Sequence, residues 1–238
     1  MSVVLAAECV TKSFRERRVL SSASLRAFTG QLRVIFGRNG EGKSTLIKIA
    51  AGRIAADSGA VHFDGRAYLT PRFHEFAARG LFYLPDHDLF SSAFTVRQQL
   101  EMIRRQFDGG SIDAAAERMG VADHLDRLPH KLSGGELRRA ELAAIMVRRP
   151  RCVLADEPFR GVAPADAEHL AEAFRQIAAT DVAVVVTGHE VPTLLEAADH
   201  VTWCTSGTTY ELGPPSSAVR DEAFRRGYLG PYLHSIAR

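Results

Sequence analysis

Short apolar runs separated by polar turns predict strands toward both ends of the chain. Continuous runs such as LRVIF and VAVVVT are typical of strands buried on both faces, whereas SLRAF alternates between apolar and polar residues. The pair Asp64-Gly65 lies inside GAVHFDGRAY and predicts a hairpin over residues 59–68. Strands are expected at residues 2–10, 22–28, 32–36, 80–84, 152–156 and 182–187.

Helical spacing replaces the strand pattern between about residues 92 and 148. Apolar residues recur there every three or four positions, which predicts helices. The expected helices span residues 43–51, 95–107, 111–120 and 134–148, and one more lies between the last two strands. Apolar strands that alternate with helices predict an α/β fold, with a parallel sheet covered on both faces and a helical insertion.

Composition and charge narrow the class of protein. The 238 residues suggest one large domain or a domain with a subdomain. A net charge of +2 argues for neither a nucleic-acid nor a membrane-surface partner, and we expect no nucleic acid. The three cysteines show no CxxC spacing, which fits a reducing cytoplasm. We predict no signal peptide and no membrane span, so a membrane role requires docking on another protein.

The strongest chemical signal is the segment GRNGEGKST, which begins at Gly37 between a predicted strand and a predicted helix. This context is typical of a P-loop. Gly37, Gly40 and Gly42 allow backbone N–H groups to turn toward phosphate oxygens, and the helix start adds unpaired N–H groups. Lys43 is predicted to reach the β- and γ-phosphates, and Ser44 to bind Mg²⁺.

Three further segments hold residues suited to phosphate chemistry. CVLADEP places Asp156 and Glu157 after a buried strand, where one carboxylate can hold Mg²⁺ through water and the other can orient attacking water. LSGGE begins a helix with Ser133 as its N-cap, and VAVVVTGH ends at His189, which can hydrogen-bond a γ-phosphate. Each segment alone is also consistent with an ordinary loop, helix cap or structural histidine.

The four segments in this order resemble the ATPase subunits of ATP-binding cassette (ABC) transporters, over nearly the whole chain. DEPFRGVAP and RRGYLGPYL look like segments of the ATPases of the lipopolysaccharide exporter and of branched-chain amino-acid importers. The resemblance implies an α/β P-loop NTPase (RecA-like) core with an N-terminal antiparallel β subdomain and an inserted α-helical subdomain. Within one domain, 1–238, we expect the core at about 1–85 and 151–215, the helical subdomain at 86–150 and a C-terminal helical tail at 216–238.

The resemblance also implies which residues form the site. Phe14 would stack on adenine with Val19 nearby, although the same phenylalanine could instead belong to the core. The implied catalytic residues are Glu157, His189 and Lys43. The implied ATP-binding residues are Phe14, Val19, Gly37, Arg38, Asn39, Gly40, Glu41, Gly42, Lys43, Ser44, Thr45, Ser133, Gly134, Gly135 and Glu136. The implied Mg²⁺ ligands are Ser44, Asp156 and Asp86.

The family's mechanism needs two copies, because each ATP lies between one chain's P-loop and the other chain's LSGGE segment. One set of motifs is present here, so we expect pairing with the chain itself or with a similar chain. The resemblance implies that ATP and Mg²⁺ are bound and that integral membrane transporter subunits are partners. The expected location is cytoplasmic, at the inner face of the cell membrane.

Two positions depart from the family pattern. Asp86, after the predicted strand LFYL, stands where the family has Gln; it can bind a hard cation but adds a carboxylate near the other acids. Ala163 stands where the family has Asp and is a poor helix N-cap. Beyond Asp86, the apolar residues Leu89, Phe90 and Phe94 either line a groove for a membrane subunit or belong to the core of the insertion.

Two other functions are compatible with the same motifs. One is a non-transport ABC ATPase that serves protein assembly or repair, although the chain has no tandem cassette, zinc module or long inserted linker. The other is a nucleotide-dependent regulator with little turnover, although Lys43, Asp156, Glu157 and His189 are all present.

Overall fold

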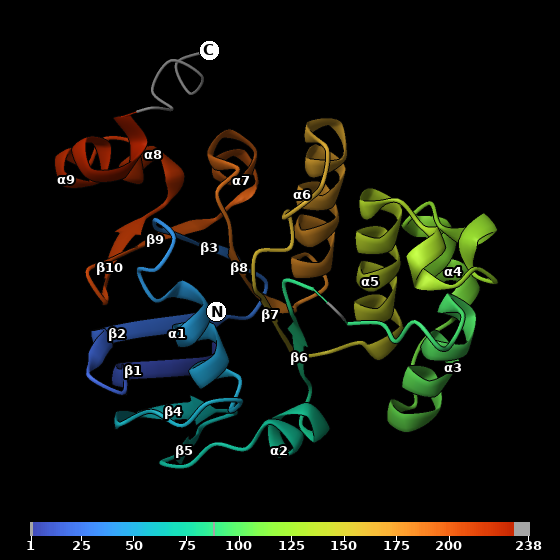
Figure 1. The fold of residues 1–238 in the computed structure, drawn as a ribbon, viewed down its shortest axis with the longest axis horizontal. Coiled ribbons are helices and arrows are strands. Elements are labelled where there is room, and N and C mark those ends of the chain that lie inside the picture. Colours follow the sequence, from blue (N-terminus) through green and yellow to red (C-terminus); the bar gives the residue numbers. More distant parts are fainter. Residues whose placement is uncertain (1, 88, 231–238) are drawn as a thin grey trace.

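The strands of the protein form a single continuous sheet in a computed structural model that describes residues 2–87 and 89–230 (Figure 1). Within these residues the strand order is β5-β4-β1-β2-β10-β9-β3-β8-β7-β6. The strands are β1 Val3–Phe14, β2 Arg17–Phe28, β3 Leu32–Phe36, β4 Ser58–Phe63, β5 Arg66–Tyr68, β6 Leu81–Leu84, β7 Cys152–Ala155, β8 Ala183–Thr187, β9 His200–Thr205 and β10 Thr208–Gly213.

The sheet has a parallel half and an antiparallel half. Strands β9, β3, β8, β7 and β6 pair in parallel, and β10 pairs antiparallel with β9. Strands β2, β1, β4 and β5 are antiparallel, and a bridge between Ser22 and Thr208 joins the two halves. The expected α/β fold, with an N-terminal antiparallel β part, is confirmed.

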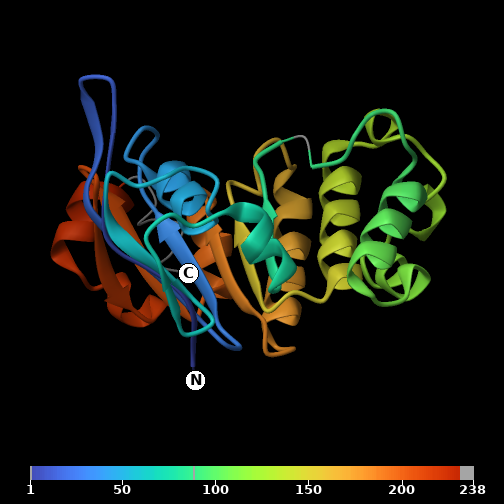
Figure 2. The ribbon, with the colours of Figure 1, turned by 90° about the horizontal axis from the view of Figure 1, so that it is seen from below.

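Helices pack on both faces of the sheet, with α1 on one face and α6 and α7 on the other (Figures 1 and 2). Helices α3, α4 and α5 form a separate group beyond β6, which is the predicted helical insertion. The helices are α1 Lys43–Ala50, α2 Phe73–Ala78, α3 Val96–Phe107, α4 Ile112–Arg118, α5 Gly134–Arg148, α6 Pro164–Ala178, α7 Val191–Ala197, α8 Pro215–Ala218 and α9 Glu222–Phe224. Shorter turns are η1 Ala122–His124, η2 Pro129–Lys131 and η3 Arg225–Leu229.

Two hydrophobic clusters cover opposite faces of the parallel strands. Val34 and Val184 belong to the cluster that contains α6 and α7, whereas Ile35 and Val185 belong to the cluster that contains α1. Successive side chains of a strand point to opposite faces, so this division means that both faces are buried. The continuous apolar runs seen in the sequence are the consequence.

Several elements differ from the sequence prediction. The first strand continues to Phe14, and β1 and β2 form a long hairpin that turns at residues 15–16. Strands β9 and β10 and helices α2 and α7 were not predicted. The hairpin turn at Asp64-Gly65 is confirmed, since both residues have the positive φ angles, 52° and 73°, that such turns require. No described helix is long and apolar enough to cross a membrane.

Candidate functional site

The GRNGEGKST segment forms a loop between the end of β3 and the start of α1. Gly42 has φ +103°, and a Cβ there would lie 2.5 Å from Leu20 Cδ2. A Cβ on Gly37 would lie 2.3 Å from the carbonyl oxygen of Cys204. Glycine is therefore required at both positions, by backbone conformation at the first and by close packing at both. The loop is a backbone cradle at the carboxyl end of a central parallel strand.

This loop lines a cavity of about 260 Å³. The cavity also contains side chains from the first hairpin and from the loop after β7. Its lining residues are Phe14, Arg17, Val19, Asn39, Gly40, Gly42, Lys43, Ser44, Thr45 and Glu157. Phe14 is 44% exposed at the tip of β1, with Lys12 Nζ 5.5 Å from its ring centroid, so it is not part of the core. Arg38 and Glu41 face elsewhere: they hydrogen-bond Gly227 and the Ser206 N–H.

Lys43 is almost completely buried at the base of the cavity, with 3% exposure. Its Nζ donates to the carbonyl oxygens of Gly37, at 2.8 Å, and Arg38, at 3.2 Å, and lies 3.6 Å from Glu157 Oε1. Burial lowers the pKa of the ammonium, and the Glu157 carboxylate opposes that shift. The Lys43 ammonium is thus held by two carbonyl oxygens and a carboxylate, and phosphate oxygens can take the place of these acceptors.

Asp156 is buried beside the first turn of α1. Its Oδ1 accepts from Ser44 Oγ at 2.8 Å and from Thr187 Oγ1 at 3.2 Å, and Lys48 Nζ lies 3.8 Å from Oδ2. Burial raises the pKa of this carboxyl, while the Ser44 hydrogen bond opposes the shift. A hydroxyl and a carboxylate this close are hard oxygen donors that suit Mg²⁺. The described residues hold no group of three or more His, Cys, Asp or Glu side chains that could hold a metal ion.

Glu157 is held in a strained backbone conformation that directs its carboxylate toward His189. Its φ is +47°, and its N–H donates to Thr187 Oγ1 at 2.8 Å. Glu157 Oε1 lies 3.2 Å from His189 Nε2, and this hydrogen bond holds the pKa of the glutamate below its usual value. Positive φ at a non-glycine residue is typical of functional sites. An ionised carboxylate at the cavity wall is able to accept a proton from water.

Comparison with known protein families identifies the family of this chain. The sequence profile of the ABC transporter family matches residues 20–160, which is more than half of the chain. The chain belongs to the ABC transporter family. It is an ATP-binding and ATP-hydrolysing subunit that powers a membrane transporter, and the comparison does not favour the non-transport or regulatory alternatives.

Named relatives match nearly the full length of this ABC subunit. The lipopolysaccharide export ATP-binding protein LptB of Haemophilus influenzae is 29% identical, over 95% of this chain and 97% of the relative. A probable ABC transporter ATP-binding protein of Azorhizobium caulinodans is 30% identical, over 95% of this chain and 83% of the relative. The expected resemblance to the lipopolysaccharide-exporter branch is therefore confirmed.

Solved structures share the fold. The ADP conformation of the ATP-binding cassette MJ1267 has a TM-score of 0.84 at 23% identity, covering 97% of this chain and 100% of that one. CbiO1 from Clostridium perfringens, part of the transporter complex CbiONQ, has a TM-score of 0.78 at 21% identity, covering 99% of this chain and 98% of that one. The likeness shows that the chain has the fold of an ABC ATPase.

The LSGGE segment begins α5 in the helical group and is absent from the ATP cavity of its own chain. Ser133 and Glu136 form a reciprocal capping box, in which the Ser133 N–H donates to Glu136 Oε2 at 2.8 Å. That backbone hydrogen bond lowers the pKa of Glu136. Gly135 packs against α6, since a Cβ there would lie 2.4 Å from Asp166 Oδ2. The N-terminus of α5 with Gly134 is thus exposed and rigid.

Asp86 lies after β6 and contacts three side chains. Its Oδ2 accepts from Arg160 Nη1 at 3.1 Å, its Oδ1 lies 2.9 Å from His87 Nδ1, and its carbonyl oxygen accepts from Arg138. The Asp86 carboxylate is thus paired with His87 and with Arg160 from the loop after β7. The other two predicted Mg²⁺ ligands, Ser44 and Asp156, hydrogen-bond each other.

Sequence reasoning missed four residues that support the site. Thr187 bonds both acidic residues, and Tyr83 donates to Asp156 at 3.4 Å. Arg160 binds Asp86, and Tyr228 lies beside His189. Thr187 could have been suspected from its place at the end of a buried strand. The other contacts join segments far apart in the chain, and no local pattern marks them.

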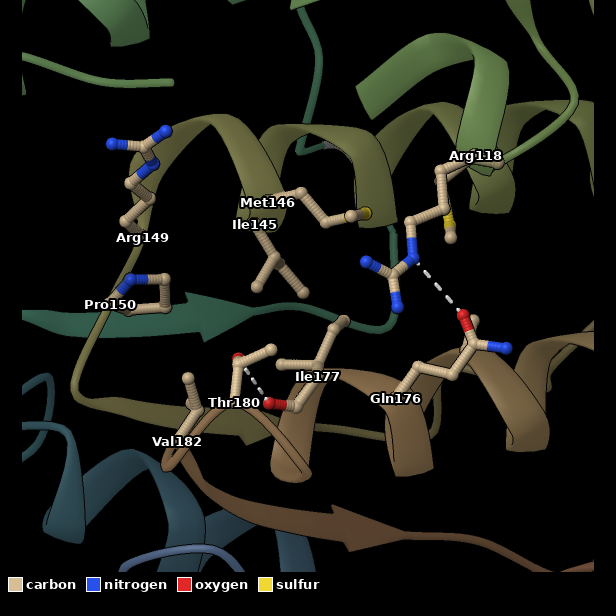
Figure 3. Close-up of a pocket in the computed structure, with 11 residues that line it drawn as sticks. Arg118, Ile145, Met146, Arg149, Pro150, Gln176, Ile177, Thr180 and Val182 are labelled. Carbon is tan, nitrogen blue, oxygen red and sulfur yellow. Dashed lines mark hydrogen bonds between the residues drawn. The ribbon is translucent and has the colours of Figure 1, made fainter. Parts of the chain in front are cut away.

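A larger cavity, of about 370 Å³, lies between α5 and α6 (Figure 3). Ile145 and Met146 face Ile177 and Val182 across it, and Arg118 donates to Gln176 at 3.2 Å. None of its lining residues belongs to the ATP cavity. The site is therefore identified by its chemistry and not by cavity size.

Proposed function

We propose that this ABC subunit pairs with a second copy of itself, or with a similar chain, around two ATP molecules. Each P-loop cavity would be closed by Ser133, Gly134, Gly135 and Glu136 of the partner. Two features support this arrangement. The cavity is open and has the exposed Phe14 at its edge, and the cap of α5 is formed but lies outside that cavity. The N-terminus of α5 supplies unpaired N–H groups for phosphate oxygens.

Within the site, the chain's own groups have distinct tasks. Lys43 and the loop amides bind the β- and γ-phosphates, and Phe14 with Val19 contacts adenine. Glu157 accepts a proton from the attacking water, and His189 hydrogen-bonds the γ-phosphate. Ser44 and Asp156 would hold Mg²⁺, which neutralises phosphate charge when bound.

A membrane partner would dock where an apolar groove of about 360 Å³ lies between α2, β6 and α3. Leu89 and Phe90 line this groove and also pack on the main core, whereas Phe94 is 40% exposed outside it. Residues 85–87 connect the part of the groove lined by β6 to the part lined by Leu89 and Phe90. A shift of residues 85–87 when ATP binds would therefore change the shape of the groove. We place the chain at the inner face of the cell membrane and assign 1–85 and 151–215 to the core, 86–150 to the helical subdomain and 216–238 to the tail, of which residues 231–238 lie outside the described residues.

The single observation that carries the pairing is the separation of the α5 cap from the ATP cavity. Its test is the molar mass of Glu157→Gln by light scattering, because this change is expected to trap bound ATP. ATP with Mg²⁺ should double the mass, and Ser133→Ala in the same background should abolish the doubling. A mass that stays monomeric with ATP would contradict the proposal. Co-purification with an integral membrane protein tests the docking groove, and Leu89→Asp should reduce it.

A further inference from the structure

The C-terminal segment of the chain reaches into the ATP site. Tyr228, in η3, is 6% exposed, and its hydroxyl lies 3.5 Å from His189 Nδ1. The neighbouring Gly227 accepts a hydrogen bond from Arg38 Nη2 of the P-loop at 3.0 Å. Both contacts join residues after 220 to the phosphate-binding region, and Gly227 and Tyr228 lie outside residues 20–160 that match the family profile.

Packing fixes where the Tyr228 hydroxyl lies. The ring stacks on Phe224, with centroids 5.5 Å apart and planes at 16°, and lies 5.8 Å from the ring of Phe36. Phe36 is the last residue of β3, directly before the P-loop. Gly227 lies against Trp203, because a Cβ there would be 2.8 Å from the indole ring. The tyrosine is therefore held by the sheet that also holds the P-loop.

Hydrogen-bond chemistry assigns a direction to each contact of His189. Its Nε2 faces Glu157 Oε1 at 3.2 Å, and an ionised carboxylate only accepts hydrogen bonds. Nε2 also lies 3.4 Å from Lys43 Nζ, but that ammonium donates at shorter range to the carbonyl oxygens of Gly37 and Arg38. The closer contact of Nε2, to the carboxylate, therefore assigns the proton to Nε2. In the neutral imidazole Nδ1 is consequently an acceptor, so the Tyr228 O–H donates to it. The two atoms lie 3.5 Å apart, at the upper end of hydrogen-bond distances.

We propose that Tyr228 is a positioning residue for His189: its hydroxyl fixes the tautomer in which Nε2–H faces the ATP cavity. This proposal rests on the proposed role of His189. The same N–H that bonds Glu157 is then oriented to donate to a γ-phosphate oxygen. If Nδ1 instead carried the proton, Nε2 would present a lone pair to that oxygen and repel it.

The test is Tyr228→Phe, which removes the hydroxyl and keeps the stacked ring. We expect kcat for ATP hydrolysis to fall roughly 10-fold, as for other partners that orient a histidine, with unchanged nucleotide affinity and melting temperature. The matched control is Tyr210→Phe, since Tyr210 is 51% exposed and packs on the same Trp203. This control should keep the wild-type rate.

A second readout does not depend on turnover. In ¹⁵N-histidine NMR spectra of the nucleotide-free chain, wild-type His189 should show the Nε2–H tautomer, and Tyr228→Phe should show a mixture. His189→Ala assigns the signal and tests the parent role, because hydrolysis should be lost. If His189→Ala keeps its activity, the role of the histidine fails, while the spectra still test the contact. The proposal is overturned if Tyr228→Phe retains both the wild-type rate and the wild-type tautomer.

Discussion

At the scale of single residues, one buried hydroxyl supports both acidic groups of the site. Thr187 is fully buried; its Oγ1 accepts from the Glu157 N–H at 2.8 Å and donates to Asp156 at 3.2 Å. The first bond helps to hold Glu157 at its positive φ. The second satisfies a carboxylate that burial would otherwise leave without enough donors.

Replacement of Thr187 by Val should therefore harm both stability and turnover. Loss of both bonds leaves a buried N–H and a buried carboxylate short of partners, which should cost about 1–3 kcal/mol in the free energy of unfolding. The rate of ATP hydrolysis should also fall. Thr187→Ser keeps the hydroxyl and should restore most of the rate. Denaturant titration and steady-state assays measure both, and a Val variant with wild-type turnover would refute this role.

The pair of Asp86 and Arg160 should control how the site responds to Mg²⁺. The two side chains are 3.1 Å apart, and the Asp86 charge contributes to the raised pKa of Asp156. Arg160→Gln frees a carboxylate near Asp156 and should lower the Mg²⁺ concentration that gives half-maximal ATPase rate. Asp86→Gln should shift the curve relative to wild type, and the double variant should match Asp86→Gln alone. Superimposable Mg²⁺ titrations for all four proteins would argue against any such control.

At the scale of elements, helices α5 and α6 begin differently. Helix α5 has a complete capping box, whereas α6 begins at Ala163 with no side-chain cap. Pro164 is preorganised for the first turn, and Asp166 forms an ion pair with Arg139 of α5 at 2.7 Å. The first turn of α6 therefore binds α5 but leaves its own N–H groups without a cap.

Ala163→Asp should supply the missing cap. The expected gain is about 0.5–2 kcal/mol in the free energy of unfolding, measured by chemical denaturation. Ala163→Leu, which offers no acceptor, is the control and should give no gain. The same aspartate in the Glu157→Gln background should also strengthen ATP-driven pairing. Equal stability of the Asp and Leu variants would rule out a capping defect at this position.

Most regular elements of the core could be predicted because their side chains repeat with the period of a strand or helix. Residues 11–14, the polar end of β1, were not predicted as a strand. Their side chains are half-buried or exposed in the hairpin, so the sequence there shows no regular apolar spacing. The P-loop and the acids after β7 could be found because local geometry demands those residues. The partners Thr187, Arg160 and Tyr228 could not, since the folded sheet alone brings them to the site.

At the scale of the whole molecule, the P-loop cavity and the cap of α5 lie apart in one chain. The P-loop cavity lies at the end of the parallel strands, and the cap of α5 belongs to the helical group beyond β6 (Figure 2). The proposed pairing requires that hydrolysis use the cavity of one chain and the α5 cap of another.

Mixing two inactive variants tests this claim most directly. Lys43→Ala removes the phosphate-binding lysine, and Ser133→Ala removes the α5 cap; each alone should hydrolyse no ATP. In a mixed pair, the cavity of the Ser133→Ala chain meets the intact cap of the Lys43→Ala chain. An equal mixture should then recover up to about a quarter of the wild-type rate, because half the pairs are mixed and each has one intact site. A mixture as inactive as its two components would contradict the account.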